Sequence, residues 1–538
     1  MQRSTAEKWK KWLSGHGFIA SVLLFACFFL FALFVNRKIK IGSLYMDDLA
    51  NYWYSLRMSF WQYAFGTVPG QTYYRPVFFG VLYLICRFIT GHLERIALVN
   101  SLLLAANGAA VFVFLKKLAV NNAVSFLITL LCLFSHLSYF IAGQMIAPVE
   151  ALSQFFSLWI LMKELDYLYR DAADPLRQKK DTVWILLLYV LAVFTHERYI
   201  GLLVPALLTF FLGKTERRVT GRRVFLLVLV FAGVMAIRFA ALRKLIPAGT
   251  SKSDVAESFQ LGEAVLFAIR QAGFVLGICT GPEYLTGKAF PDSALWVKAF
   301  SLLGAALMLG MILCYFIQKL KPRKTGEEMS GADWRIDALF LTSVMMYIAS
   351  SSVTIRLEMR WIYVSFTVCM IYGGYMVTVL GRRRKKGKKA LWAAFLLLLL
   401  LRGTCEYYYR GFYDNIFFFR SMKATNSLAE ETVGKYSREE LGQKTFYLVT
   451  NTYDLSGKFW YNFYEPFFGE ADDSGITRID TVEYQTDLLA AERYPDREAS
   501  KEEYERLREE MTRELLRRED AVLLLEDTEN GTYTVMER

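Results

Sequence analysis

Long apolar blocks recur along this chain of 538 residues, and they restrict its fold more than any other feature. The first block runs from Phe18 to Val35, and others follow at short intervals up to about residue 402. Because an α-helix rises about 1.5 Å per residue, such blocks can cross a hydrocarbon core about 30 Å thick. Hydrophobic residues make up 54% of the chain, against about 45–50% in soluble domains. We therefore predict an α-helical polytopic membrane protein.

Basic residues in the short loops between these blocks set the predicted topology. The net charge of +12 would suggest a nucleic-acid partner in a soluble protein, but here most Lys and Arg residues lie in loops. Cytoplasmic loops are the ones enriched in Lys and Arg, so we predict no nucleic-acid partner and a multi-pass protein of the cell membrane. Placing every basic loop inside gives about eleven transmembrane helices, with the N-terminus cytoplasmic and the C-terminus outside. The predicted spans are residues 17–35, 96–115, 122–141, 148–166, 182–196, 199–213, 222–242, 293–317, 336–354, 361–380 and 390–402.

Two further apolar stretches, residues 77–89 and 263–280, are left open as crossing or re-entrant segments. The first is short for a span. If it does not cross, every later basic loop falls on the cytoplasmic side, as expected. The seven cysteines lie mostly in apolar blocks, without the paired spacing of a zinc or disulfide site. We therefore predict no metal site of that kind.

The composition becomes polar and charged near Cys405. We predict a transmembrane domain over residues 1–404 and a small extracytoplasmic α/β domain over 405–538. Hydrophobic patterning within the second domain predicts the following elements. Strands are expected at 445–450, 521–525 and 532–536, and helices at 417–435 and 500–520.

An acidic pair, Asp47 and Asp48, follows the first predicted span and lies on the outer face. Acidic residues beside a membrane can act as general bases toward an acceptor hydroxyl. The alternative is a solvated loop or a helix N-cap, and the pair alone does not decide between them.

Three other polar motifs fall on the same predicted face. Arg75 closes the outer loop directly before Pro76, which suits the first turn of a helix. The motif 195–198 (Thr-His-Glu-Arg) lies between two short apolar blocks, where ionisable residues are costly. Arg356 to Trp361 contains Arg-x-Glu-x-Arg, and its arginines suit an anionic group such as a phosphate. The alternatives are loop charges, a polar turn and a helix-capping Arg–Glu pair, respectively.

Over roughly residues 15–400 the chain resembles the GT-C superfamily of membrane glycosyltransferases, especially its protein O-mannosyltransferase and aminoarabinose-transferase-like branch. The resemblance rests on Asp47-Asp48 after the first span, Arg75-Pro76 before a helix, His196-Glu197 between two short spans, and the late motif 356–361. The chain departs from the family in having Asp-Asp where Asp-Glu is common, and His196 where Lys is usual.

The resemblance implies inverting transfer of one sugar from a polyprenyl-phosphate donor to an extracytoplasmic acceptor: a cell-surface glycan, a lipid or a protein. The outer loop 36–95 would be catalytic, with Asp47 or Asp48 as general base. Position within the pair selects Asp47, and spacing to Tyr52 selects Asp48. A divalent cation on the acids is possible but not required. The remaining implied residues are Arg75, Arg356 and Arg360 for the donor phosphate, and Tyr52, Tyr74, His196, Glu197 and Glu358 for binding or support.

Two other functions fit parts of this pattern. A transporter or flippase of lipid-linked saccharides would also need ionisable groups, but near the middle of the membrane and on broken helices. A non-catalytic envelope assembly protein would use only its outer domain. The gathering of ionisable residues at one predicted face favours the transferase.

Overall fold

The computed structural model describes residues 17–67, 73–169, 174–243, 260–320, 333–353, 357–383, 388–450, 463–469 and 479–536. The chain forms two compact units, which are described separately. The first unit contains residues up to Ile39, Ala64–Val81 and Leu98–Asn415. The second contains Lys40–Tyr63, Leu82–Ala97 and Ile416–Arg538.

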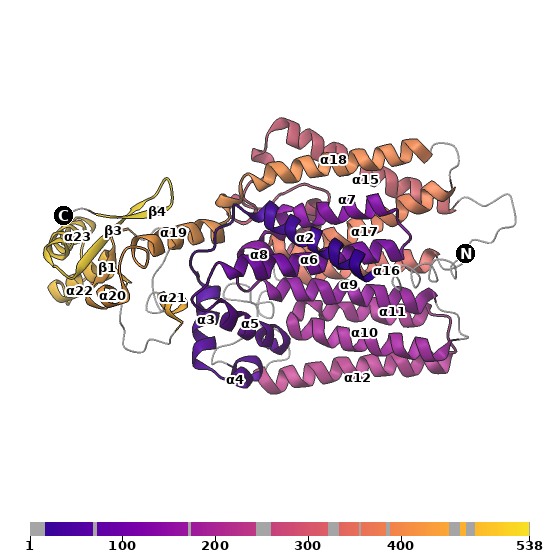
Figure 1. Cartoon of the computed structure of the whole chain (residues 1–538), viewed down its shortest axis with the longest axis horizontal. Helices are drawn as coiled ribbons and strands as arrows, with labels where there is room; N and C mark the ends of the chain where they lie inside the picture. The colour runs from indigo at the N-terminus through magenta and orange to yellow at the C-terminus, as the bar shows by residue number, and fades with distance from the viewer. Residues whose placement is uncertain are drawn as a thin grey trace. The chain divides into compact units, whose positions relative to one another are not determined.

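The first unit is a bundle of helices, and its long members run side by side in Figure 1. Helix α9 packs along α10, α16 packs against α17, and α15 packs against α18. The long helices are α2 (Gly17–Asn36), α6 (Arg95–Lys117), α7 (Asn122–Phe134), α9 (Pro148–Tyr169), α10 (Pro175–Thr195), α11 (Leu203–Leu212), α12 (Arg217–Leu242), α13 (Leu261–Val275), α15 (Leu295–Leu320), α16 (Asp333–Ser352), α17 (Met359–Arg383) and α18 (Lys388–Arg410). The short ones are η1 (His136–Ser138), α8 (Tyr139–Gly143), η2 (Glu197–Leu202), α14 (Glu283–Thr286), η3 (Phe290–Asp292) and η4 (Tyr413–Asn415).

The bundle has the apolar exterior of a multi-pass membrane protein. Leu23 and Leu30 of α2 and Phe225 of α12 are each more than 60% exposed, which a lipid surface would cover. Among the described residues, six helices are long and apolar enough to span a membrane, or seven if the bent pair Asn122–Phe134 and His136–Gly143 is one span. Each predicted span overlaps helical residues, although span 122–141 covers α7, η1 and α8, and span 199–213 covers η2 and α11. The number of eleven crossings stays a prediction.

The stretch predicted as a short apolar segment, 77–89, is helix α5 (Pro76–Ile89), which begins at the proline as expected. It is shorter than the helices that satisfy the length requirement for a span. Residues 263–280 correspond mainly to α13. Crossing and re-entrant arrangements therefore both remain for these two stretches.

The second unit contains a four-stranded sheet with the strand order β2-β1-β3-β4. Strand β1 (Thr445–Leu448) is parallel to β2 (Ile479–Thr481) and to β3 (Ala521–Asp527), which is antiparallel to β4 (Thr532–Val535). Its helices are α3 (Asp47–Arg57), most of α4 (Phe60–Phe65), α19 (Phe417–Glu431), α20 (Arg438–Gln443), α21 (Glu465–Phe468), α22 (Val482–Arg493) and α23 (Lys501–Arg517).

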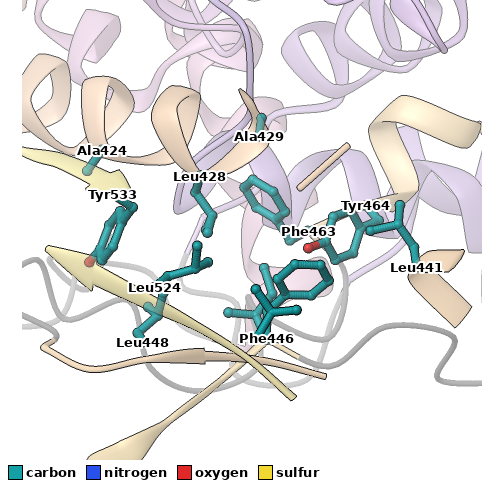
Figure 2. Close-up of a cluster of buried hydrophobic side chains, with 12 residues drawn as sticks. Ala424, Leu428, Ala429, Leu441, Phe446, Leu448, Phe463, Tyr464, Leu524 and Tyr533 are labelled. Atoms are coloured by element: carbon teal, nitrogen blue, oxygen red, sulfur yellow. The ribbon is translucent and has the colours of Figure 1, made fainter. Parts of the chain in front are cut away.

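One face of this sheet packs on α19 and forms the core of the domain. Figure 2 shows Leu428 of α19 close to Leu524 of β3, with Phe446 of β1 beside them. The small α/β domain and its three predicted strands are therefore confirmed. Strand β2 was not predicted, because its sequence, Ile-Asp-Thr, has no apolar run.

Loop residues before α3 and α3 itself are bound to the α/β domain within this unit. The backbone N–H of Gly42 donates to Oδ1 of Asn426 at 2.9 Å, and Ser43 Oγ donates to Thr425 Oγ1 at 2.6 Å. Arg57, the last residue of α3, donates two hydrogen bonds to Glu465 at 2.9 and 2.5 Å. These contacts fix the helix that begins with the acidic pair.

Candidate active site

A two-bond ion pair joins Arg75 to Glu197 in the first unit. Nε of Arg75 donates to Oε2 of Glu197 at 2.7 Å, and Nη2 donates to Oε1 at 2.5 Å. Arg75 directly precedes α5, and Glu197 opens η2 directly after the cap of α10. Burial alone would raise the pKa of Glu197, but the positive charge of Arg75 and its hydrogen bonds hold that pKa well below the usual range.

Arg238 of α12 reaches the same carboxylate from another helix. Its Nη1 lies 3.9 Å from Oε2 of Glu197 and donates to the backbone oxygen of Tyr74 at 3.3 Å. The side chain of Arg238 is almost fully buried. Tyr74, which we expected to support the substrate, is itself buried and contributes its carbonyl here.

A second buried pair joins Glu150 to Arg198. Nη2 of Arg198 donates to Oε2 of Glu150 at 2.5 Å. Glu150 lies in the first turn of α9, and Arg198 is the second residue of η2. His196 lies between the two pairs: its Nδ1 accepts from the backbone N–H of Arg198 at 3.2 Å, and its Nε2 is 3.7 Å from Oε1 of Glu150.

The late arginine motif contributes Arg360 and Trp361 at the start of α17. Nε of Arg360 lies 2.6 Å from Oε2 of Glu358. The guanidinium carbon of Arg360 is 4.4 Å from the ring centre of Phe140 and 5.7 Å from that of Trp361. The guanidinium carbon of Arg198 lies 5.4 Å from the same Trp361 ring. Arg356 lies outside the described residues.

These side chains form what we call the arginine–glutamate cluster. It contains four arginines and three glutamates, so one positive charge is left over among the described members. Charged groups buried in a membrane protein are costly and commonly mark substrate paths. The surplus charge suits a singly charged anion. Its members are Arg75, Arg198, Arg238, Arg360, Glu150, Glu197 and Glu358.

The acidic pair lies in the first turn of α3, in the second unit. Asp47 is exposed, whereas Asp48 is only 2% exposed. Neither is the N-cap, which is Met46 with a φ of 45° and no side-chain capping bond. Positive φ in a residue with a side chain is strained, and such strain gathers at functional sites. Tyr52 is fully buried and shares a 3.0 Å hydrogen bond with Thr90.

The structure thus brings together Arg75 and the pair His196-Glu197, which belong to two separate sequence motifs. Asp47, Asp48 and Tyr52 belong to the other unit. Glu150 and Arg238 were missed. Arg238 carried a usable signal, because it is a charged residue within the predicted span 222–242. Glu150 carried the same signal, because it lies within the predicted span 148–166, but its partner Arg198 is 48 positions away.

No protein-family model and no curated protein matches this chain. Among solved structures it is similar to ArnT from Cupriavidus metallidurans bound to undecaprenyl phosphate, with a TM-score of 0.46 and 12% identity over 96% of this chain and 94% of that one. The oligosaccharyltransferase AglB from Archaeoglobus fulgidus, in complex with an inhibitory peptide and a dolichol-phosphate, gives 0.45 and 11% over 95% and 70%. A complex of the A. fulgidus oligosaccharyltransferase with Zn and sulfate gives 0.43 and 10% over 94% and 68%.

Proposed function

We propose that this chain is a GT-C-type membrane glycosyltransferase that moves one sugar from a polyprenyl-phosphate donor to an extracytoplasmic acceptor. The arginine–glutamate cluster carries this proposal. It gathers charged side chains from the segment before α5, from α9, η2 and α12, and from the start of α17, in a unit whose exterior is apolar. A lipid phosphate presents both properties that such a site selects: an apolar chain and a negative charge.

Arg75 and Arg360 are proposed to hold the donor phosphate, together with Arg356, which lies outside the described residues. Glu197 uses Nε and Nη2 of Arg75, so Nη1 is not used by that carboxylate. Glu358 engages Arg360 through Nε. Each arginine is therefore oriented by a glutamate. Fixed positive charge at the leaving phosphate stabilises the negative charge that develops as the sugar departs.

Asp47 is proposed as the general base, because its carboxylate is exposed whereas Asp48 is buried. In this step the acceptor hydroxyl gives its proton to Asp47 and its oxygen forms a bond to the anomeric carbon. The bond from that carbon to the phosphate oxygen breaks on the opposite side, and polyprenyl phosphate leaves. Attack opposite the leaving group inverts the configuration. Asp48 then supports α3 and does not take the proton.

The proposed orientation has the N-terminus in the cytoplasm and the α/β domain outside, where that domain helps to bind the acceptor. A divalent cation on the acids was left possible by the sequence. In the part of the chain that the structure describes, no group of three or more His, Cys, Asp or Glu side chains is placed to hold a metal ion. No step is assigned to a metal ion.

Mass spectrometry of the surface glycans of a deletion strain tests this function. The strain should lack one sugar, which the natural chain restores and an Asp47→Asn/Asp48→Asn variant does not, although the variant reaches the membrane at equal level. Full restoration by that variant would remove the transferase proposal and favour the transporter. An unchanged glycan profile in the deletion strain would remove both.

A further inference from the structure

Three buried polar atoms on Arg198 and two residues near it have no hydrogen-bond partner: Oε1 of Glu150, Nη1 of Arg198 and Nε1 of Trp361. The hydroxyl of Tyr199 also has none. The side chains of Glu150 and Arg198 are 3% and 6% exposed, and Trp361 is 8% exposed. Leaving such a group without a partner costs about 1–3 kcal/mol. Such atoms on neighbouring side chains indicate a site that is completed by something other than the protein.

Arg198 is the neighbour of both other residues. Arg198 binds the other oxygen of Glu150, and its guanidinium carbon lies 5.4 Å from the Trp361 ring centre. The ring of Tyr199 is also 5.4 Å from that carbon, so two aromatic rings flank the polar atoms. All of these residues belong to the first unit.

The mixture of donors and acceptors selects the chemistry of the ligand. An anion would satisfy the N–H groups of Arg198 and Trp361 but would be repelled by the free oxygen of Glu150. A cation would have the opposite problem. A hydroxyl both donates and accepts, so a compound with several hydroxyls satisfies all three atoms. Flat aromatic surfaces beside a few placed polar groups also suit a small ring with apolar faces.

Resting on the proposed function, we infer that Glu150, Arg198 and Trp361 bind the hydroxyls of the sugar that the donor carries. The position agrees with the chemistry of the donor, in which sugar and phosphate are joined by one bond. Arg360, the proposed phosphate ligand, lies 5.7 Å from the ring centre of Trp361. A buried water has the same donor and acceptor capacity, so the test must separate it from a sugar.

The test measures the binding of defined lipids to the purified full-length chain in detergent. The probes are undecaprenyl phosphate and the same lipid carrying a pentose, a hexose or an N-acetylhexosamine. We expect at least one sugar-bearing lipid to bind at least about tenfold more tightly than undecaprenyl phosphate. Trp361→Phe keeps a ring but removes the N–H group. It should reduce this preference about tenfold, the effect of one lost hydrogen bond, with the affinity for undecaprenyl phosphate unchanged.

Trp159→Phe is the matched control, because Nε1 of Trp159 is also buried without a partner but lies about 14 Å along α9 from Glu150. It should change neither affinity. Monodeoxy analogues of the preferred sugar give a test that does not depend on the folding of a variant. One analogue should bind the natural chain about tenfold more weakly than the parent lipid does. The same analogue and the parent lipid should bind Trp361→Phe with equal affinity, as in a double-mutant cycle.

The inference would be overturned if the natural chain showed no preference for any sugar-bearing lipid. It would also be overturned if the preference survived in Trp361→Phe, which would indicate a water site. An equal loss of affinity for undecaprenyl phosphate and for the sugar-bearing lipid in Trp361→Phe would indicate an anion site and would likewise overturn it. Each is a binding result. If this inference failed, a loss of sugar transfer in the Asp47 and Asp48 variants would still support the proposed function. If those variants remained active, a sugar preference that depends on Trp361 would still support the sugar site.

Discussion

Arg75 and Glu197 are 122 positions apart and form an ion pair with two hydrogen bonds, of 2.7 and 2.5 Å. Both side chains are 14% exposed, and Arg238 approaches the same carboxylate. The pair therefore connects the start of α5 to the turn after α10. Arg75 and Arg238 share the negative charge of the single carboxylate of Glu197. Removing Glu197 would place two arginines face to face.

Glu197→Gln should therefore lower the free energy of unfolding by about 3 kcal/mol, because it leaves buried positive charges without their partner. Arg75→Gln/Glu197→Gln should lose less than the sum of the two single variants, by about 1–3 kcal/mol. Titration with sodium dodecyl sulfate in mixed micelles measures these values. Glu510→Gln is a matched control, because Glu510 also accepts two bonds from one arginine, at 2.8 and 2.9 Å, but on an exposed surface. It should show no measurable loss. Strictly additive single variants would contradict the pairing.

The lowered pKa of Glu197 gives the pH dependence of this pair. A carboxyl whose pKa is lower in the folded than in the unfolded chain adds stability above its unfolded pKa, about 4.3, and loses it as the pH falls toward the folded value. The difference in stability between the natural chain and Glu197→Gln should be constant from pH 8 to about pH 5.5 and should shrink only below about pH 4.3. A difference that already shrinks between pH 8 and pH 6 would contradict this assignment. Thermal unfolding in detergent across that range measures it.

Met46→Gly should stabilise the protein by about 1 kcal/mol, because glycine adopts a positive φ without strain. It should also slow sugar transfer if the strained backbone at Met46 holds Asp47 in place. Ala119, with a φ of 59°, lies between α6 and α7 and provides the control. Ala119→Gly should stabilise the chain similarly and leave transfer unchanged. Thermal unfolding and transfer by reconstituted protein check both variants. Unchanged transfer in Met46→Gly would separate the strain from catalysis.

Phe446→Ala should destabilise the α/β domain by about 3–5 kcal/mol. The reason is that the Phe446 side chain is fully buried in the core between the sheet and α19. Amide hydrogen exchange of β1 and β3 should accelerate, while that of α9 and α10 should not. Leu525 of β3 is 43% exposed, so Leu525→Ala should have little effect. Equal exchange rates in the natural chain and Phe446→Ala would show that this core contributes little.

Much of the helical fold could be predicted because apolar length is a local property of the sequence. Helix α9, for example, begins at Pro148 as predicted, and the strand at 521–525 lies within β3. Helix α18 was predicted to end at 402 but continues to Arg410. Its polar last turns are stabilised by distant contacts, such as that of Glu406 with Nδ1 of His136 at 2.5 Å. Such a contact cannot be inferred from the residues around 406 alone.

The same reason limits the site. His196 and Glu197 could be found because ionisable residues interrupt an apolar stretch. The partners that define their surroundings, Glu150 and Arg238, come from other helices and become neighbours only when the bundle packs. The three unpartnered atoms at Glu150, Arg198 and Trp361 are likewise a property of packing. The sequence therefore indicated where charged residues gather, but not which of their polar atoms lack a protein partner after the helices pack.

Sugar transfer by Asp47→Asn tests the central claim most directly. The experiment reconstitutes the natural chain, Asp47→Asn and Asp48→Asn separately with the sugar-bearing lipid that the natural chain binds most tightly. An acceptor extract is then added, and the release of polyprenyl phosphate is measured. The account predicts a loss of about 10²–10⁴-fold for Asp47→Asn with donor binding unchanged, and a smaller loss for Asp48→Asn that follows its stability. Transfer by Asp47→Asn at the rate of the natural chain would contradict it.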